Sequence, residues 1–118
     1  MSVQVDVWLR GENVATTQVI DGVRPDAHTW TDDDVRGILE GMLQAMHRLK
    51  HPHETDRAIA LRGLSWIVNP YDEGGVVIAI EITMGAAIAG PFDIDKTRLE
   101  SMISRVLAHR PASSTTVH

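Results

Sequence analysis

The chain contains no cysteine among its 118 residues, and this absence removes several kinds of chemistry at once. Disulfide bonds, thiolate metal sites and thiol nucleophiles all need a cysteine side chain. A chain without cysteine is compatible with the reducing cytosol, and we expect a soluble, cytoplasmic protein. The amino terminus agrees with this expectation, because residues 1–6 form neither the basic segment nor the apolar segment of a secretion signal.

Positive charge is also scarce. Eleven Lys and Arg residues stand against 16 Asp and Glu residues, which gives an acidic chain with a formal net charge of −5. Nucleic-acid binding needs clustered Lys and Arg to neutralise phosphates, and the basic residues here are scattered. The longest apolar run, residues 76–89, is interrupted by Glu81 and is shorter than the roughly 20 residues that span a bilayer. We therefore expect neither a nucleic-acid partner nor a membrane partner.

What remains is the composition of an ordinary folded domain. Hydrophobic residues make up 43% of the chain and charged residues 23%, which is close to the average of globular proteins. The length matches the commonest size of one domain. We predict a single domain over residues 1–110 and a flexible, Ser- and Thr-rich tail over residues 111–118.

The first part of the chain predicts a β-hairpin. Apolar residues occupy every second position over residues 3–9, which is typical of a strand with one buried face. A turn at residues 11–13 allows residues 14–20 to return as a partner strand with a weaker pattern.

The clearest signature in the sequence is that of a helix that begins after Thr31. Thr31 is a favourable N-cap, and the three aspartates at residues 32–34 stabilise the positive end of the helix dipole. Trp30 and Val35 have the spacing of a hydrophobic staple across this cap. Apolar residues then recur at helical spacing, and Pro52 ends the helix near residue 50 or 51.

The second half predicts another hairpin. The apolar residues over 58–68 change parity in the middle of the segment, and a bulge at Gly63 would return them to one face. Strong turn residues at 69–75 connect this strand to residues 76–84, where the alternation is unbroken. Gly90-Pro91 is expected to close that strand.

A second helix follows, and it completes a repeated order of elements. Asp95 is a suitable N-cap, apolar residues between Leu99 and Leu107 form one stripe, and Arg110-Pro111 ends the helix. The order is therefore ββαββα. We predict an α+β fold, a two-layer sandwich in which an antiparallel four-stranded sheet carries both helices on one face.

The opposite, outer face of this sheet carries the main functional prediction. A sheet face in contact with water should be mostly polar, yet the alternation places four apolar or half-apolar residues there: Trp8, Ile67, Val77 and Ala79. Exposed apolar area is unfavourable by about 25 cal/mol per Å², and large exposed patches usually mark contact surfaces. Two simpler explanations are that β-branched residues suit strands, or that the tail and residues 21–29 cover the patch.

Small residues form a line along the first predicted helix. Gly37 and Gly41 are four residues apart, and Ala45 continues the line. Because each internal glycine costs a helix about 1 kcal/mol relative to alanine, the line suggests that another backbone approaches there. That neighbour would be the second helix or another protomer.

Three histidines, His47, His51 and His53, form the only cluster of potential metal ligands. Imidazole binds zinc, nickel and copper, and His47 and His51 are one helical turn apart. Glu54 and Asp56 could add oxygen ligands. The opposing interpretation is that histidines favour helix C-termini because of the dipole, and Pro52 interrupts the cluster.

Residues for catalysis are few, and no catalytic residue is predicted. The chain has no phosphate-binding loop, nucleophile elbow or zinc-hydrolase motif. Ser65, with Arg62 and Glu81 nearby, is the only polar grouping on the second hairpin, and an ordinary cross-strand pair explains it better. The small side chains of residues 85–90 would let a ligand or a backbone approach, or would simply end a strand.

These observations favour a noncatalytic interaction or accessory protein that needs no cofactor. It would self-associate, as a homodimer in the simplest case, or bind a protein partner through the outer sheet face. The alternative is a small-molecule or metal-binding domain, and even a small enzyme. That domain would use a divalent metal at His47, His51 and His53, or a pocket between helices and sheet.

Overall fold

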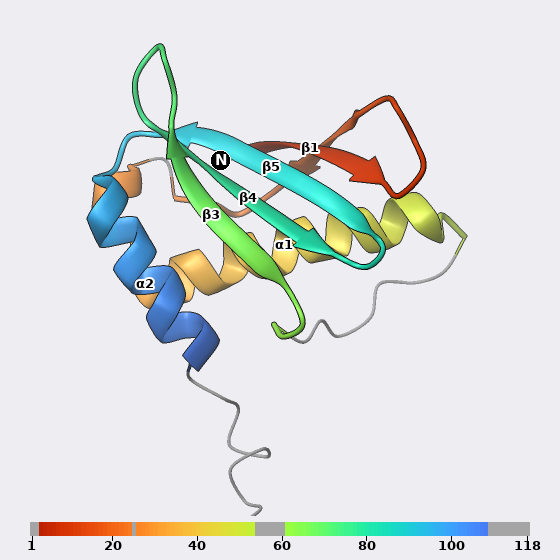
Figure 1. The fold of residues 1–118 in the computed structure, drawn as a ribbon. Coiled ribbons are helices and arrows are strands. Elements are labelled where there is room, and N and C mark those ends of the chain that lie inside the picture. Colours follow the sequence, from red (N-terminus) through yellow and green to blue (C-terminus); the bar gives the residue numbers. More distant parts are fainter. Residues whose placement is uncertain (1–2, 25, 54–60, 109–118) are drawn as a thin grey trace, which may run out of the picture.

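The computed structural model describes residues 3–24, 26–53 and 61–108. Within these residues the chain is an α+β fold, with a five-stranded antiparallel sheet and two α-helices (Figure 1). A short 3-10 helix over Ala27–Thr29 precedes the first α-helix. The elements are β1 (Val3–Leu9), β2 (Thr16–Ile20), α1 (Asp32–Lys50), β3 (Ser65–Pro70), β4 (Val76–Ile82), β5 (Gly85–Phe92) and α2 (Lys96–Ala108).

The strand order is β2-β1-β5-β4-β3, so the last strand in the described part of the chain pairs with the first. Val5 lies opposite Ala89, and Leu9 lies opposite Gly85. A Cβ atom at Gly85 would overlap the carbonyl oxygen of Trp8. Glycine at this position therefore allows the backbones of β1 and β5 to approach one another.

One face of the sheet forms the hydrophobic core together with both helices. The alternation of each strand places one complete row of buried or half-buried side chains on this inner face: Val7, Ala87, Ile80 and Trp66 lie side by side across four strands. Helix α1 contacts β1, β2 and β5, while α2 contacts β3 and α1. In Figure 1 α1 runs behind the sheet, and α2 lies at the left beside β3.

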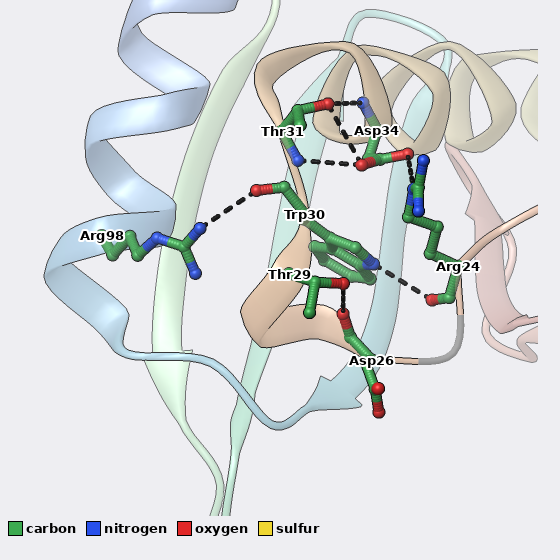
Figure 2. A network of polar contacts seen from close by, with 7 residues as sticks. All are labelled: Arg24, Asp26, Thr29, Trp30, Thr31, Asp34 and Arg98. Carbon is green, nitrogen blue, oxygen red and sulfur yellow. Dashed lines mark hydrogen bonds and ion pairs between the residues drawn. The ribbon is translucent and has the colours of Figure 1, made fainter.

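The start of α1 is fixed by a capping box, as Figure 2 shows. The Oγ1 atom of Thr31 accepts a hydrogen bond from the Asp34 backbone N–H at 3.4 Å, and the Asp34 carboxylate accepts one from the Thr31 N–H at 2.8 Å. The backbone hydrogen bond from Thr31 lowers the pKa of Asp34, and the Arg24 guanidinium at 3.3 Å acts in the same direction. The predicted N-cap and helix start are confirmed.

Trp30 joins the start of α1 to the rest of the core. Its side chain is 2% exposed, and its ring packs edge-on against Phe92 with 4.8 Å between centroids. The indole N–H donates to the carbonyl oxygen of Arg24 at 3.0 Å. From α2, the Arg98 guanidinium donates to the carbonyl oxygens of Trp30 and His28 (Figure 2 draws the former). Hydrogen bonds thus hold both the side chain and the backbone of Trp30.

A second polar contact holds the two helices together at the surface. The Arg105 guanidinium donates two hydrogen bonds of 2.9 Å to the Asp32 carboxylate. The hydrogen bonds from Arg105 lower the pKa of Asp32, and the same contact raises the pKa of Arg105. The two-pronged geometry orients α2 relative to the first turn of α1.

The prediction of four strands in the order ββαββα is wrong in one element, because the structure has a fifth strand and the order ββαβββα. Residues 76–84 were expected to form one strand, but β4 ends at Ile82 and the chain reverses at Thr83 and Met84. Neither residue is typical of a tight turn, so the pattern gave no signal for the reversal. The segment predicted as the end of a strand, with Gly90-Pro91 as its stop, is β5 itself.

The strand before the second hairpin also begins later than predicted. β3 starts at Ser65, and residues 61–64 are not part of a strand. Gly63 has a φ of +69° and lies in a bend before β3. The bulge predicted within the strand at this residue is therefore wrong. The remainder of the predicted strand, residues 58–60, lies outside the described residues, as do residues 109–118 with the predicted tail.

The line of small residues along α1, for which the second helix or another protomer was the predicted neighbour, faces the sheet at Gly41. A Cβ atom at Gly41 would lie 2.7 Å from Cγ2 of Ile20, so a side chain of β2 packs against this glycine. At Gly37 a Cβ atom would meet nothing within 4 Å. The close approach at Gly41 is therefore between helix and sheet, and it involves a side chain instead of a second backbone.

Neither α1 nor α2, which are the α-helices of the described segments, has the length and apolar character needed to cross a bilayer.

Candidate functional site

The outer face of the sheet carries two complete rows of side chains that cross four strands. In the first row, from β1 to β3, the residues are Trp8, Ala86, Glu81 and Ser65. In the second row they are Asp6, Ile88, Ala79 and Ile67. Both helices contact the sheet from the opposite side.

A hollow crosses the middle of these rows, because a small side chain lies between two larger ones in each. Ala86 lies between Trp8 and Glu81. Ala79 lies between Ile88 and Ile67. The two alanines are diagonal neighbours on adjacent strands, so the hollow runs obliquely to the strands. We call it the outer groove; Trp8, Ile67, Ala79, Glu81, Ala86 and Ile88 line it, and its volume is about 530 Å³.

The outer groove is open to solvent and mainly apolar. Ile67 is 52% exposed and Ile88 is 37% exposed, although both are large aliphatic residues. Trp8, Ala79 and Ala86 are half-buried. Ser65 and Glu81 contribute the only hydroxyl and carboxylate groups to the lining. The site therefore offers an apolar surface with few groups that could carry out acid–base or nucleophilic chemistry.

Charged residues flank the outer groove on two sides. Asp6 lies on β1 beside Ile88, and Glu81 lies on β4 beside Ala86. The Asp6 carboxylate accepts a hydrogen bond of 2.8 Å from Thr17. A guanidinium nitrogen of Arg10 lies 3.8 Å from the Glu81 carboxylate, and both side chains are about two-thirds exposed at 64% and 65%. Ion pairs of this length and exposure are weak, so Glu81 keeps most of its capacity to bind another cation.

Three of the four residues predicted for the interface lie together, since Trp8, Ile67 and Ala79 all line the outer groove. Val77 is on the same face but lies two residues along β4 from Ala79, outside the groove. The strand prediction missed two further members, Ala86 and Ile88, because both belong to β5. No alternation in the sequence could reveal them, because residues 86–89 are three alanines and an isoleucine.

The predicted histidine cluster is brought together only in part. The rings of His47 and His51 have centroids 4.9 Å apart, as expected for residues one helical turn apart, and His47 is buried. His53 lies in the exposed turn after α1. The described residues contain no group of three or more His, Asp or Glu side chains that could hold a metal ion. Glu54 and Asp56 lie outside the described residues, and the metal site stays a prediction.

The structure brings together two of the three residues of the polar grouping predicted on the second hairpin. Ser65 lies directly opposite Glu81 in the pairing of β3 with β4. The nearest ion-pair partner that the structure shows for Glu81 is Arg10 from the end of β1, whereas Arg62 precedes β3. Arg10 also donates a hydrogen bond of 2.7 Å to the Thr83 carbonyl, which places it at the turn between β4 and β5.

Comparisons with protein-family models, with curated proteins and with solved structures give no match to this chain.

Proposed function

We propose that this chain is a noncatalytic interaction protein that binds a protein surface through the outer groove. The observation that carries the proposal is the position of the groove. It is an apolar hollow on the sheet face opposite α1 and α2, and its two isoleucines are 37% and 52% exposed. Leaving such a surface in water is unfavourable at about 25 cal/mol per Å². Contact with another protein would remove this free-energy cost.

The shape of the outer groove favours a protein over a small molecule as the bound partner. Sites for small molecules usually bury most of the ligand within a closed cleft, and several polar groups fix its orientation. The outer groove is open along the sheet and has only Ser65 and Glu81 as a hydroxyl and a carboxylate. Protein interfaces, in contrast, commonly have an apolar centre with tryptophan and a charged rim, and Trp8 with the flanking acids Asp6 and Glu81 matches this description.

The protein that binds could be a second copy of this chain or another protein, and self-association is the simpler case to test. Light scattering over a range of concentrations would give the oligomeric state. If copies bind through the outer groove, Trp8→Glu and Ile67→Glu should each yield a monomer. Val14→Glu is the matched control, because Val14 is 73% exposed and lies in the turn between β1 and β2.

A photo-crosslinking experiment would test the proposal for either kind of partner. A benzophenone amino acid at position 67, inside the outer groove, should yield a discrete crosslinked protein in the native cells. The same amino acid at position 14 or 71 should not, although Val14 and Tyr71 are also exposed. The mass of the product tells whether the partner is a second copy. Crosslinking that is equally weak at all three positions would contradict the proposed function.

A further inference from the structure

We infer that the partner segment that fits the outer groove is an amphipathic α-helix with basic residues on both sides of its apolar stripe. This inference rests on the proposed function and names the chemistry of the partner. Three features of the groove carry it: its concave shape, its place opposite two helices, and the arrangement of its acidic residues.

The concave shape favours a convex occupant over a second copy of the same face. If two outer faces stacked about a twofold axis through the hollow over Ala79 and Ala86, that hollow in one copy would meet the identical hollow in the other. Such a pair would leave an unfilled apolar space between the two copies, and empty apolar volume is strongly unfavourable. A helix is convex, with a diameter of about 10 Å including side chains. Its large apolar residues could fill the hollow.

The architecture of the sheet points in the same direction. An apolar face needs to pack against another layer, and a helix is one of the elements that can supply that layer. Helices α1 and α2 cover the inner face. Ile67 and Ile88 on the outer face would be buried by a third layer. A helix from a partner would supply that layer and present residues at i, i+3, i+4 and i+7 to the groove.

The acidic residues at the rim of the groove favour a partner with positive charge. Asp6 lies at one side of the groove on β1 and Glu81 lies diagonally across from it on β4. Arg10 is 3.8 Å from Glu81 in an exposed, weak contact that leaves this acid accessible. The net charge of the chain, −5, adds a long-range attraction for cations. Lysine or arginine on both sides of an apolar stripe would meet one acid on each side.

Model peptides can test this inference directly. The first probe is an 18-residue helical peptide with leucine on one face and lysine on the other; the second has glutamate in place of every lysine. A third has the composition of the first but with two central leucines replaced by proline, which prevents the helix. Calorimetry on the full chain should show binding of the leucine–lysine helix at least tenfold tighter than binding of either control peptide.

Variants of the protein separate groove binding from general attraction between opposite charges. Ala86→Lys places a cation inside the groove and should weaken the lysine peptide at least tenfold, whereas Val14→Lys makes the same change of net charge elsewhere. Asp6→Lys with Glu81→Lys should reverse the preference toward the glutamate peptide. Asp72→Lys with Glu73→Lys, two exposed acids in the turn after β3, is the matched control and should keep the original preference. Circular dichroism of each variant confirms that it folds.

Each outcome decides the inference. Loss of binding in Ala86→Lys but not in Val14→Lys, together with the reversed preference, supports it. Equal weakening in both variants would show nonspecific attraction and overturn it. A dimer that Ile67→Glu dissociates, and that the lysine peptide does not, would also overturn it, while the proposed function would stand. A monomer that binds no peptide would overturn the inference as well. Only the failure of crosslinking at position 67 would contradict the proposed function.

Discussion

The two faces of the sheet are both apolar at their centres, but they use this property differently. On the inner face, Val7, Ala87 and Ile80 lie side by side and are at most 2% exposed beneath the helices. On the outer face, Trp8, Ala86 and Glu81 form the neighbouring row, and the next row has an isoleucine that is 52% exposed. The inner face supplies stability to the fold. We expect the outer face to contribute less to stability, because its large aliphatic side chains stay partly exposed.

The largest difference should appear when the same substitution is made at adjacent residues of β5. Ala87 is fully buried on the inner face and Ala86 is half-buried on the outer face. Ala87→Lys would bury an unpaired ammonium group, which we expect to cost about 4 kcal/mol or more of unfolding free energy. Ala86→Lys should cost less than about 1 kcal/mol, because its ammonium group reaches solvent and Glu81 lies opposite. Urea unfolding followed by circular dichroism measures both; similar losses would remove the distinction between the faces.

A smaller but clear difference is expected between two isoleucines. Ile78 on β4 is 0% exposed and Ile67 on β3 is 52% exposed. Ile78→Ala leaves a cavity in the core and should lose about 3 kcal/mol. Ile67→Ala removes a side chain that is already half exposed to water, so the free energy of unfolding should fall by less than about 1 kcal/mol. The measurement is again the free energy of unfolding in urea. If Ile67→Ala were as costly as Ile78→Ala, the outer face would have to be part of the core.

Two glycines of α1 test the contact between the inner layers on a finer scale. Gly37→Ala should stabilise the protein by about 1 kcal/mol, because alanine favours the helix and a Cβ atom meets nothing within 4 Å. Gly41→Ala should lose about 1 kcal/mol despite the same helical gain, because its Cβ atom would crowd Ile20 at 2.7 Å. Opposite shifts in the melting temperature are expected. Shifts of the same sign would show that Ile20 moves aside easily.

The smallest effect concerns the start of α1 and appears only in acid. The pKa of Asp34 is lowered in the folded state. Its stabilising effect is therefore fully present above the unfolded-state value of 3.8 and is lost as the pH falls through the lower, folded-state value. Asp34→Asn should flatten the pH dependence of the melting temperature below about pH 4. Asp33→Asn, which leaves the capping box intact, is the control and should keep the dependence of the original protein.

The sequence predicted the parts of the fold that carry a local chemical signal. Thr31 and the aspartates after it fixed the start of α1, and Pro52 fixed its end near Lys50. The alternation of residues 3–9 fixed β1, with Val5 and Val7 in the core. In each of these cases the signal lies within a few residues of the feature it specifies, so no knowledge of distant contacts was needed.

β5 shows why the remainder was missed. Its residues are mostly glycine and alanine, which are poor strand formers, and they are suitable here because β1 and β4 approach from both sides. Gly85 lies against the backbone of Trp8, and Gly90 lies against Val76 and Val77. The small residues were interpreted as allowing a close approach, and the approaching groups are the neighbouring strands. That information depends on the order of strands, which a local pattern does not contain.

The candidate site, like the fold, was predicted only where the strands themselves were predicted. Trp8, Ile67 and Ala79 were assigned to the correct face by alternation alone, because β1, β3 and β4 were predicted with the correct parity. Ala86 and Ile88 were missed together with their strand. Val77 was included because alternation shows on which face of the sheet a side chain lies, but not where on that face the groove is. The hollow itself arises from the alignment of β5 with β4, which pairs each alanine with larger neighbours.

The pairing of β1 with β5 has a consequence for how the molecule is made. Strands β1 and β5 are far apart in the sequence, so the N-terminal hairpin has an unpaired edge until residues 85–92 pair with it. Sheets closed by such distant segments form more slowly than those closed by neighbouring ones. During synthesis, the backbone amides and carbonyls along this edge of β1 therefore have no strand partner until residues 85–92 have been made.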